Sequence, residues 1–87
     1  MSESQQRERD LFFLGQAIGQ LREEHGLSTD QLAAATGSER TRIQALEAGQ
    51  LDPDYELLLA LAEALGIRPS AFVIRAEELQ AEPGASG

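Results

Sequence analysis

Glycine recurs at the end of each apolar segment in the middle of the chain, and this punctuation limits the chain to short helices. The four glycines concerned are Gly26, Gly37, Gly49 and Gly66. Between them, apolar residues return every three or four positions, as they do on one face of a helix, and no segment alternates with the period of two that a half-buried strand shows. Glycine just after the last apolar position is typical of a helix end. We therefore expect an all-α fold.

Five helices are predicted from these patterns and from the capping residues. They are a helix over about 10–25, a helix over Thr29–Thr36 capped by Ser28, a helix of about ten residues capped by Ser38 and starting at Glu39, a helix after the turn Asp52-Pro53-Asp54, and a helix from Pro69. Residues 1–9 and 80–87 lack apolar periodicity, so they are expected to be flexible tails around a domain of residues 10–79. Five such helices can share one core only by crossing steeply, which predicts a compact five-helix orthogonal bundle.

The composition argues against several classes of function. The chain has no cysteine and one histidine, His25, so a disulfide, a thiolate nucleophile and a zinc site are not expected. The longest apolar run without a charge, residues 57–62, is far below the roughly 18 to 20 residues that span a bilayer. No nucleophile, base and oxyanion donor can be assembled. We expect a cytoplasmic protein that is not an enzyme, with no cofactor, no metal and no membrane contact.

The charge balance limits how the chain could bind nucleic acid. Seven arginines stand against 15 acidic residues, which gives a net charge of −8. A molecule of this charge repels phosphate at long range. Binding to DNA would therefore depend on the local arrangement of a few arginines.

Residues 29–48 have the spacing of two short helices that cross through a tight turn. Ala33 is small enough for the close approach of the helices, and Gly37 provides a residue that accepts positive φ in the turn. Leu32, Ile43 and Leu46 would fill the apolar wedge behind them. This arrangement leaves the opposite face of the second helix free to meet a partner.

At this point the sequence resembles the Cro and repressor type of helix-turn-helix proteins, the Xre-like family, over about residues 11–74. The resemblance is carried by LGQAIGQLREEHGLSTDQLAAATGS, then RIQALEAG, then LLLALAEALGI, in the order and spacing of the family. It implies a repressor-like DNA-binding domain of five helices whose third helix enters the major groove of double-stranded DNA. It also implies a homodimer on a palindromic site, and hence a regulator of transcription.

The resemblance assigns roles to individual residues. Those expected to face base edges are Glu39, Arg40, Thr41, Gln44 and Ala45, and those expected to meet phosphates are Ser28, Thr29 and Arg42. Arg40 is the preferred base reader because a guanidinium can donate two hydrogen bonds to guanine. Arg22 and Glu47 are expected to form a structural pair between the first and third helices. The expected dimer seam consists of Ala71, Val73, Ile74 and the loop before the fourth helix.

Several residues depart from this pattern and keep a second hypothesis open. Thr29 is shorter than the glutamine common in the family and cannot brace a neighbouring base-reading side chain. Residues 29–54 contain five acidic and two basic residues, a local charge of −3, so weak phosphate affinity is expected. Glu39 is more readily explained by the helix dipole than by base reading. The alternative is a protein-interaction module, antitoxin-like or a co-regulator, that binds a basic partner.

Overall fold

The computed structural model describes residues 2–82 and contains five helices with no strand among these residues. The helices are α1 (Glu3–Glu24), α2 (Thr29–Thr36), α3 (Arg40–Glu47), α4 (Tyr55–Leu65) and α5 (Ser70–Ala81). The predicted all-α class and the number of helices are confirmed.

Helix α1 begins seven residues earlier than the sequence pattern predicted. The hydroxyl of Ser2 accepts a hydrogen bond from the backbone N–H of Gln5, and the Gln5 side chain accepts one from the N–H of Ser2. This reciprocal cap satisfies helix donors that otherwise have no partner. Residues 3–9, expected to be a flexible tail, are therefore helical.

The other helix ends agree with the prediction more closely. Ser28 caps α2 and Asp54 caps α4 as expected, and left-handed Gly37 and Gly66 end these two helices. The predicted cap of α3 was wrong: Glu39, not Ser38, is the N-cap residue, and its side chain makes no capping hydrogen bond. Helix α5 begins after Pro69 and continues to Ala81, so residues 80 and 81 are helical rather than part of a tail. The remainder of the predicted tail, residues 83–87, lies outside the described residues.

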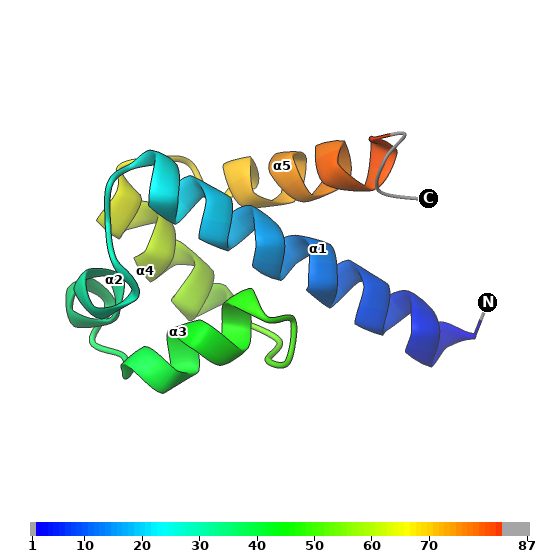
Figure 1. The fold of residues 1–87 in the computed structure, drawn as a ribbon, viewed down its shortest axis with the longest axis horizontal. Coiled ribbons are helices and arrows are strands. Elements are labelled where there is room, and N and C mark those ends of the chain that lie inside the picture. The colour runs from blue at the N-terminus through cyan, green and yellow to red at the C-terminus, as the bar shows by residue number, and fades with distance from the viewer. Residues whose placement is uncertain (1, 83–87) are drawn as a thin grey trace.

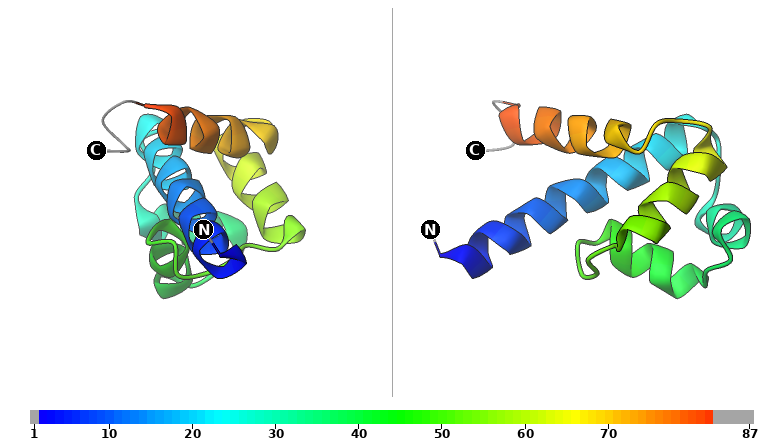
Figure 2. Two further views of the ribbon diagram at one scale, coloured as in Figure 1. Left: turned by 90° about the vertical axis from the view of Figure 1, so that its right-hand side faces the viewer. Right: turned by 180° about the vertical axis from the view of Figure 1, so that it is seen from behind.

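The helices cross steeply around one core, as the prediction of an orthogonal bundle requires. Helix α5 packs along α1 on the side opposite α3, and α4 lies behind them (Figure 1 and Figure 2). The axes of α4 and α5 differ in direction by 94°. The fully buried side chains at the centre are Ile18, Leu32, Ile43, Leu46, Leu61 and Phe72. A second apolar cluster, made of Phe13, Ala17, Ala76 and Leu79, joins the middle of α1 to the second half of α5.

No single helix among residues 2–82 is long and apolar enough to cross a bilayer. Helices α4 and α5 reach the required length and apolarity only when they are taken together, as a pair that is sharply bent.

Candidate nucleic-acid interface

Helices α2 and α3 form a tight two-helix unit whose inner side is closed by apolar residues. The turn between them passes through Gly37 at φ +68°, and the N–H of Ser38 donates to the carbonyl of Ala33 at 2.9 Å. Ala33 is almost fully buried, in agreement with its predicted position where the helices approach closely. Because Ile43 and Leu46 fix the inner side of α3 in the core, its opposite side faces outward.

The outward side of α3 carries the side chains expected to face base edges. Glu39, Arg40, Thr41 and Gln44 are exposed, and Ala45 is half-buried. Successive helical positions are about 100° apart, so Thr41 lies opposite the buried Ile43 and Leu46. Arg40 and Arg42 lie on the two edges of this outward side of α3. The helix therefore presents an exposed face with Thr41 and Ala45 near its centre and a guanidinium on each side.

Arg40 has a partner that the sequence did not reveal. Its Nε lies 3.7 Å from Oδ1 of Asp30 on α2, and both side chains remain more than half exposed. An exposed pair of this kind contributes little stability. The guanidinium can therefore leave the carboxylate without a large cost. The residue next to Asp30, Thr29, makes no hydrogen bond with Arg40 within the described part of the chain, in agreement with the expectation that its short side chain does not brace a base-reading residue.

The residues expected to meet phosphate lie at the start of α2 and on α3. The Ser28 hydroxyl accepts from the N–H of Gln31 at 3.0 Å, and the Gln31 side chain accepts from the N–H of Ser28 at 2.8 Å. The next donors available to an anion are the N–H groups of Thr29 and Asp30, the first two of the helix.

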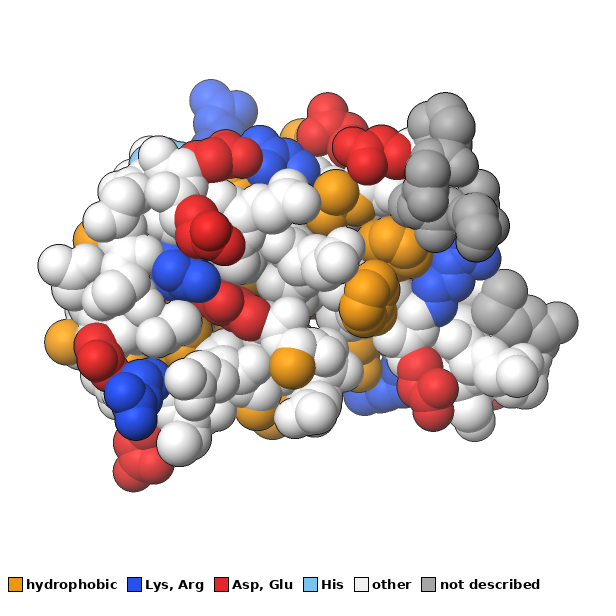
Figure 3. Space-filling view, in the orientation of Figure 1, with side chains coloured by type: hydrophobic (Ala, Val, Ile, Leu, Met, Phe, Trp, Pro, Cys, Tyr) orange, Lys and Arg blue, Asp and Glu red, His pale blue; other side chains and the backbone are white. Residues whose placement is uncertain are grey.

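Arg42 lies in a different electrostatic setting from the start of α2. It is exposed and lines a shallow polar pocket of about 280 Å³ together with Ser38, Asp54 and Glu56. The two carboxylates lower the positive potential around the guanidinium. On the face seen in Figure 3, arginines and acidic side chains are interspersed rather than gathered into a basic surface. Phosphate binding would therefore use few cations.

Arg22 and Glu47 join α1 to the end of α3, as predicted. Nε and Nη2 of Arg22 donate to the two carboxylate oxygens of Glu47 at 2.7 and 3.0 Å, and Nη1 donates to the carbonyl of Leu27 at 2.8 Å. The hydrogen bond to Glu47 is the main cause that raises the pKa of Arg22 above its ordinary value. Both side chains are largely buried. Arg22 of α1 therefore holds both the end of α3, through Glu47, and the segment before α2, through Leu27.

Glycines let the backbone of α1 touch the end of α3 directly. A Cβ on Gly15 would lie 2.5 Å from the carbonyl oxygen of Leu46 and 2.7 Å from that of Glu47. A Cβ on Gly49, at φ +77°, would lie 2.9 Å from the Cα of Phe12. All three distances are shorter than real Cβ contacts, so only glycine fits at these two positions. This direct contact between the backbones of α1 and α3 fixes the position of α3, and so the direction in which its exposed face points.

The residues expected at a dimer seam lie on α5, away from α3. Val73 and Ile74 are each about half exposed, and Ala71 is partly buried. Tyr55, at the start of α4 after the preceding loop, is exposed as well. Val73 and Ile74 are adjacent in the sequence, and neighbouring exposed apolar side chains are a frequent feature of protein interfaces.

These features define a helix-turn-helix domain, and comparison with known families agrees. The helix-turn-helix family profile, of the Xre/Cro type, matches residues 18–72, and the chain belongs to this family. The matched range includes α2, α3 and α4. It leaves out the first 15 residues of α1 and the last nine residues of α5. Comparison with curated protein sequences gave no match.

Solved structures of regulators are similar to the chain. The restriction-modification controller protein C.AhdI from Aeromonas hydrophila is 36% identical, with coverage of 72% of this chain and 96% of the controller and a TM-score of 0.71. Two crystal structures of the clp gene regulator ClgR from Corynebacterium glutamicum are also similar. One is 28% identical, with coverage of 83% and 94% and a TM-score of 0.79. The other is 27% identical, with coverage of 88% and 82% and a TM-score of 0.82.

Proposed function

We propose that the chain is a DNA-binding regulator of transcription that inserts α3 into the major groove and acts as a cytoplasmic homodimer on a palindromic site. The observation that carries this proposal is the arrangement of α3: its apolar side is buried, and the side with Arg40, Thr41 and Gln44 is exposed. In helix-turn-helix proteins this second helix of the motif lies in the groove with its amino-terminal residues on the base edges. The chain binds rather than catalyses.

Within this proposal the two arginines of α3 have different tasks. Arg40 leaves Asp30 and donates two hydrogen bonds to guanine, while Thr41, Gln44 and Ala45 contact neighbouring bases. Glu39 lies at the edge of this set. Arg42, with Ser28, Thr29 and the N–H groups at the start of α2, binds phosphate and sets the position of the domain on the duplex.

The experiment is selection of bound sequences from random duplex DNA, followed by titration of the selected duplex with variants. We expect Arg40→Ala to lose about 1 to 3 kcal/mol of discrimination at one base pair of each half-site. Arg42→Ala should instead weaken all sequences equally and reduce the dependence of binding on salt. If the two variants have the same effect, the assignment of their roles is wrong. If no sequence is enriched, the proposed function is wrong.

A second function is favoured by one specific observation, the acidity of the surface. The net charge is −8, and Asp54 and Glu56 lie beside Arg42. Such a surface suits a basic protein partner better than a phosphate backbone. Absence of any selected DNA, together with binding of a cationic protein segment, would favour this function.

A further inference from the structure

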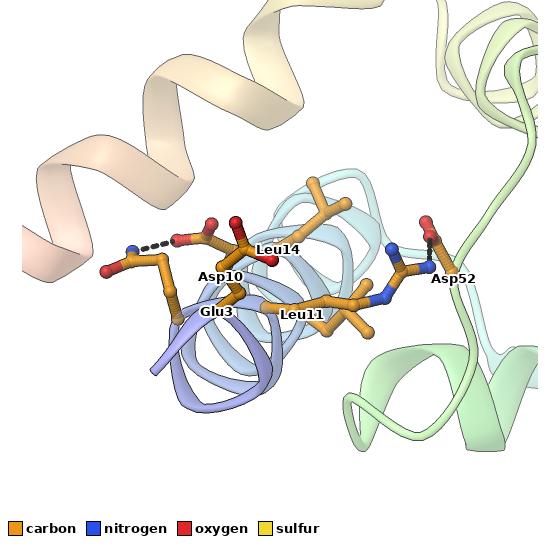
Figure 4. A pocket seen from close by; sticks show the side chains of 7 residues that line it. Glu3, Asp10, Leu11, Leu14 and Asp52 are labelled. Atoms are coloured by element: carbon orange, nitrogen blue, oxygen red, sulfur yellow. Dashed lines mark hydrogen bonds and ion pairs between the residues drawn. The ribbon is translucent and has the colours of Figure 1, made fainter. Parts of the chain in front are cut away.

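A groove that takes no part in the proposed contact with DNA runs along the amino-terminal half of α1. One part, of about 460 Å³, lies between α1 and the loop of residues 48–54, and the other, of about 200 Å³, lies between α1 and α5. Asp10 and Leu14 line both parts, so the two parts adjoin each other at α1. In Figure 4 the side chain of Leu14 lies between α1 and α5, and a dashed line marks the ion pair between Asp52 and Arg7. We call this feature the α1–α5 groove.

The α1–α5 groove has an apolar floor. The floor is formed by Leu11, Leu14, Val73 and Ala76. Val73 is half exposed to solvent, and Leu11 and Leu14 are only partly buried. Apolar side chains that are left accessible in a concave site can be covered by apolar residues of a ligand or of another protein.

The rim of the groove is acidic. Among the described residues that line it, four carry carboxylates, which are Glu3, Asp10, Asp52 and Glu77, and Arg7 carries the one guanidinium. The Asp10 carboxylate is held by the amides of Gln6 at 3.0 Å and Gln80 at 3.3 Å. A rim with this balance attracts cationic groups and repels nucleic acid.

The groove is built almost entirely from segments outside the family match. The match covers residues 18–72, whereas the lining residues, apart from Asp52, lie before residue 15 or after residue 72. The amino-terminal extension of α1 forms one wall because of its capping box at Ser2 and the ion pair of Arg7. The groove is therefore formed mainly by parts of α1 and α5 that the family profile does not cover.

We propose that the α1–α5 groove binds a cationic amphipathic segment of another protein, with the apolar side chains of that segment on the floor and its lysines or arginines on the rim. A second copy of this chain fits less well, because its own groove would bring a second set of the same carboxylates against the first. Val73 belongs both to the floor and to the proposed dimer seam. If the chain forms the proposed homodimer, the cationic segment and the second copy consequently cannot occupy Val73 at the same time.

The test uses the full chain and a synthetic helical peptide of leucine and lysine that carries one tryptophan among its leucines. The chain contains no tryptophan, so the emission reports only on the peptide. We expect a blue shift of the emission when the peptide binds, because the tryptophan enters the apolar floor. A peptide with glutamate in place of lysine should not bind. Attraction by charge alone would produce binding without the blue shift and would overturn the proposal.

Variants locate the binding site on the chain. Glu77→Gln and Asp10→Asn should each weaken binding of the peptide about two- to fivefold, as expected for one exposed charge pair. Glu63→Gln removes the same charge from the exposed side of α4 and should leave binding unchanged. If all three variants behave alike, the peptide does not use the groove. Should Asp10→Asn alter the fold, Glu77→Gln and Glu63→Gln still make the comparison.

Competition with the dimer is measured separately by sedimentation. We expect the peptide to produce complexes of one chain and one peptide, and to release DNA selected as described above. A dimer that persists with its groove closed to the peptide would overturn the proposed occupant in favour of a second copy. If the peptide enters the groove but DNA stays bound, only the mutual exclusion is wrong. If no DNA is selected, the proposed function is wrong. The fluorescence experiment still shows whether the peptide binds the groove.

Discussion

Gly15 is the residue that most directly sets the distance between α1 and α3. A side chain there would collide with two carbonyl oxygens of the α3 terminus, and backbone atoms cannot move aside as a flexible side chain can. Gly19, one turn later in α1, faces only the carboxylate of Glu47, 3.2 Å from where its Cβ would lie. Gly15 and Gly19 can therefore be compared directly, because a side chain at the first would meet backbone atoms and one at the second would meet a side chain.

We expect Gly15→Ala to lower the free energy of unfolding by about 1 to 2 kcal/mol. Overpacking costs about 1 to 3 kcal/mol, and the higher helix propensity of alanine recovers up to about 1 kcal/mol of this. Gly19→Ala gains the same propensity and should remain within about 1 kcal/mol of the original chain. Urea unfolding followed by circular dichroism makes the measurement. Equal stability of the two variants would show that the α1–α3 contact is looser than described.

At the scale of elements, Arg75 ties α5 to α1. Its Nη1 donates to Oε2 of Glu24 at 2.6 Å and to the Gln20 side chain at 3.1 Å, and its Nη2 donates to Oε1 of Glu24 at 3.0 Å. The hydrogen bond from Arg75 is the main cause that lowers the pKa of Glu24 below its ordinary value of 4.5. A carboxyl whose pKa is lower in the folded state stabilises the fold above its unfolded pKa. This stabilisation is lost as the pH falls through the folded pKa.

We therefore expect Glu24→Gln to destabilise the chain at neutral pH and to have progressively less effect as the pH drops below 4.5. Glu63→Gln on the exposed side of α4 is the control, with no arginine partner to lose in the described residues. Thermal unfolding across this pH range makes the measurement. A difference between the two variants that does not change with pH would contradict the role of Arg75.

The elements also show what the sequence could and could not predict. Helices α2 and α4 were predicted almost to the residue, because a capping side chain and a terminal glycine mark both of their ends. The start of α1 was missed because residues 3–9 have no apolar side, although the Ser2 and Gln5 capping box was present in the sequence. The ion pairs of Arg7 with Asp52 and of Arg40 with Asp30 join separate elements, so their distances depend on the tertiary arrangement.

At the scale of the whole molecule, the proposed homodimer makes a prediction that separates it from the α1–α5 groove. Ile74 is half exposed on α5 and does not line the groove. We expect Ile74→Asp to produce monomers in sedimentation experiments, because a charge would be buried in the seam. This variant should bind the selected palindrome weakly. Its affinity for a duplex with a single half-site should equal that of the original chain as a monomer. Dimers of Ile74→Asp would place the seam elsewhere.

The continuous helix α1 has a mechanical consequence. Its first turns form one wall of the groove, and Gly15, Gly19 and Arg22 farther along the same helix hold the end of α3. A helix of 22 residues is about 33 Å long and bends little without a proline or an inserted water. A change in the direction of α1 would therefore move the end of α3 with it. A force that tilts the amino-terminal end of α1 would thus be transmitted to the exposed face of α3.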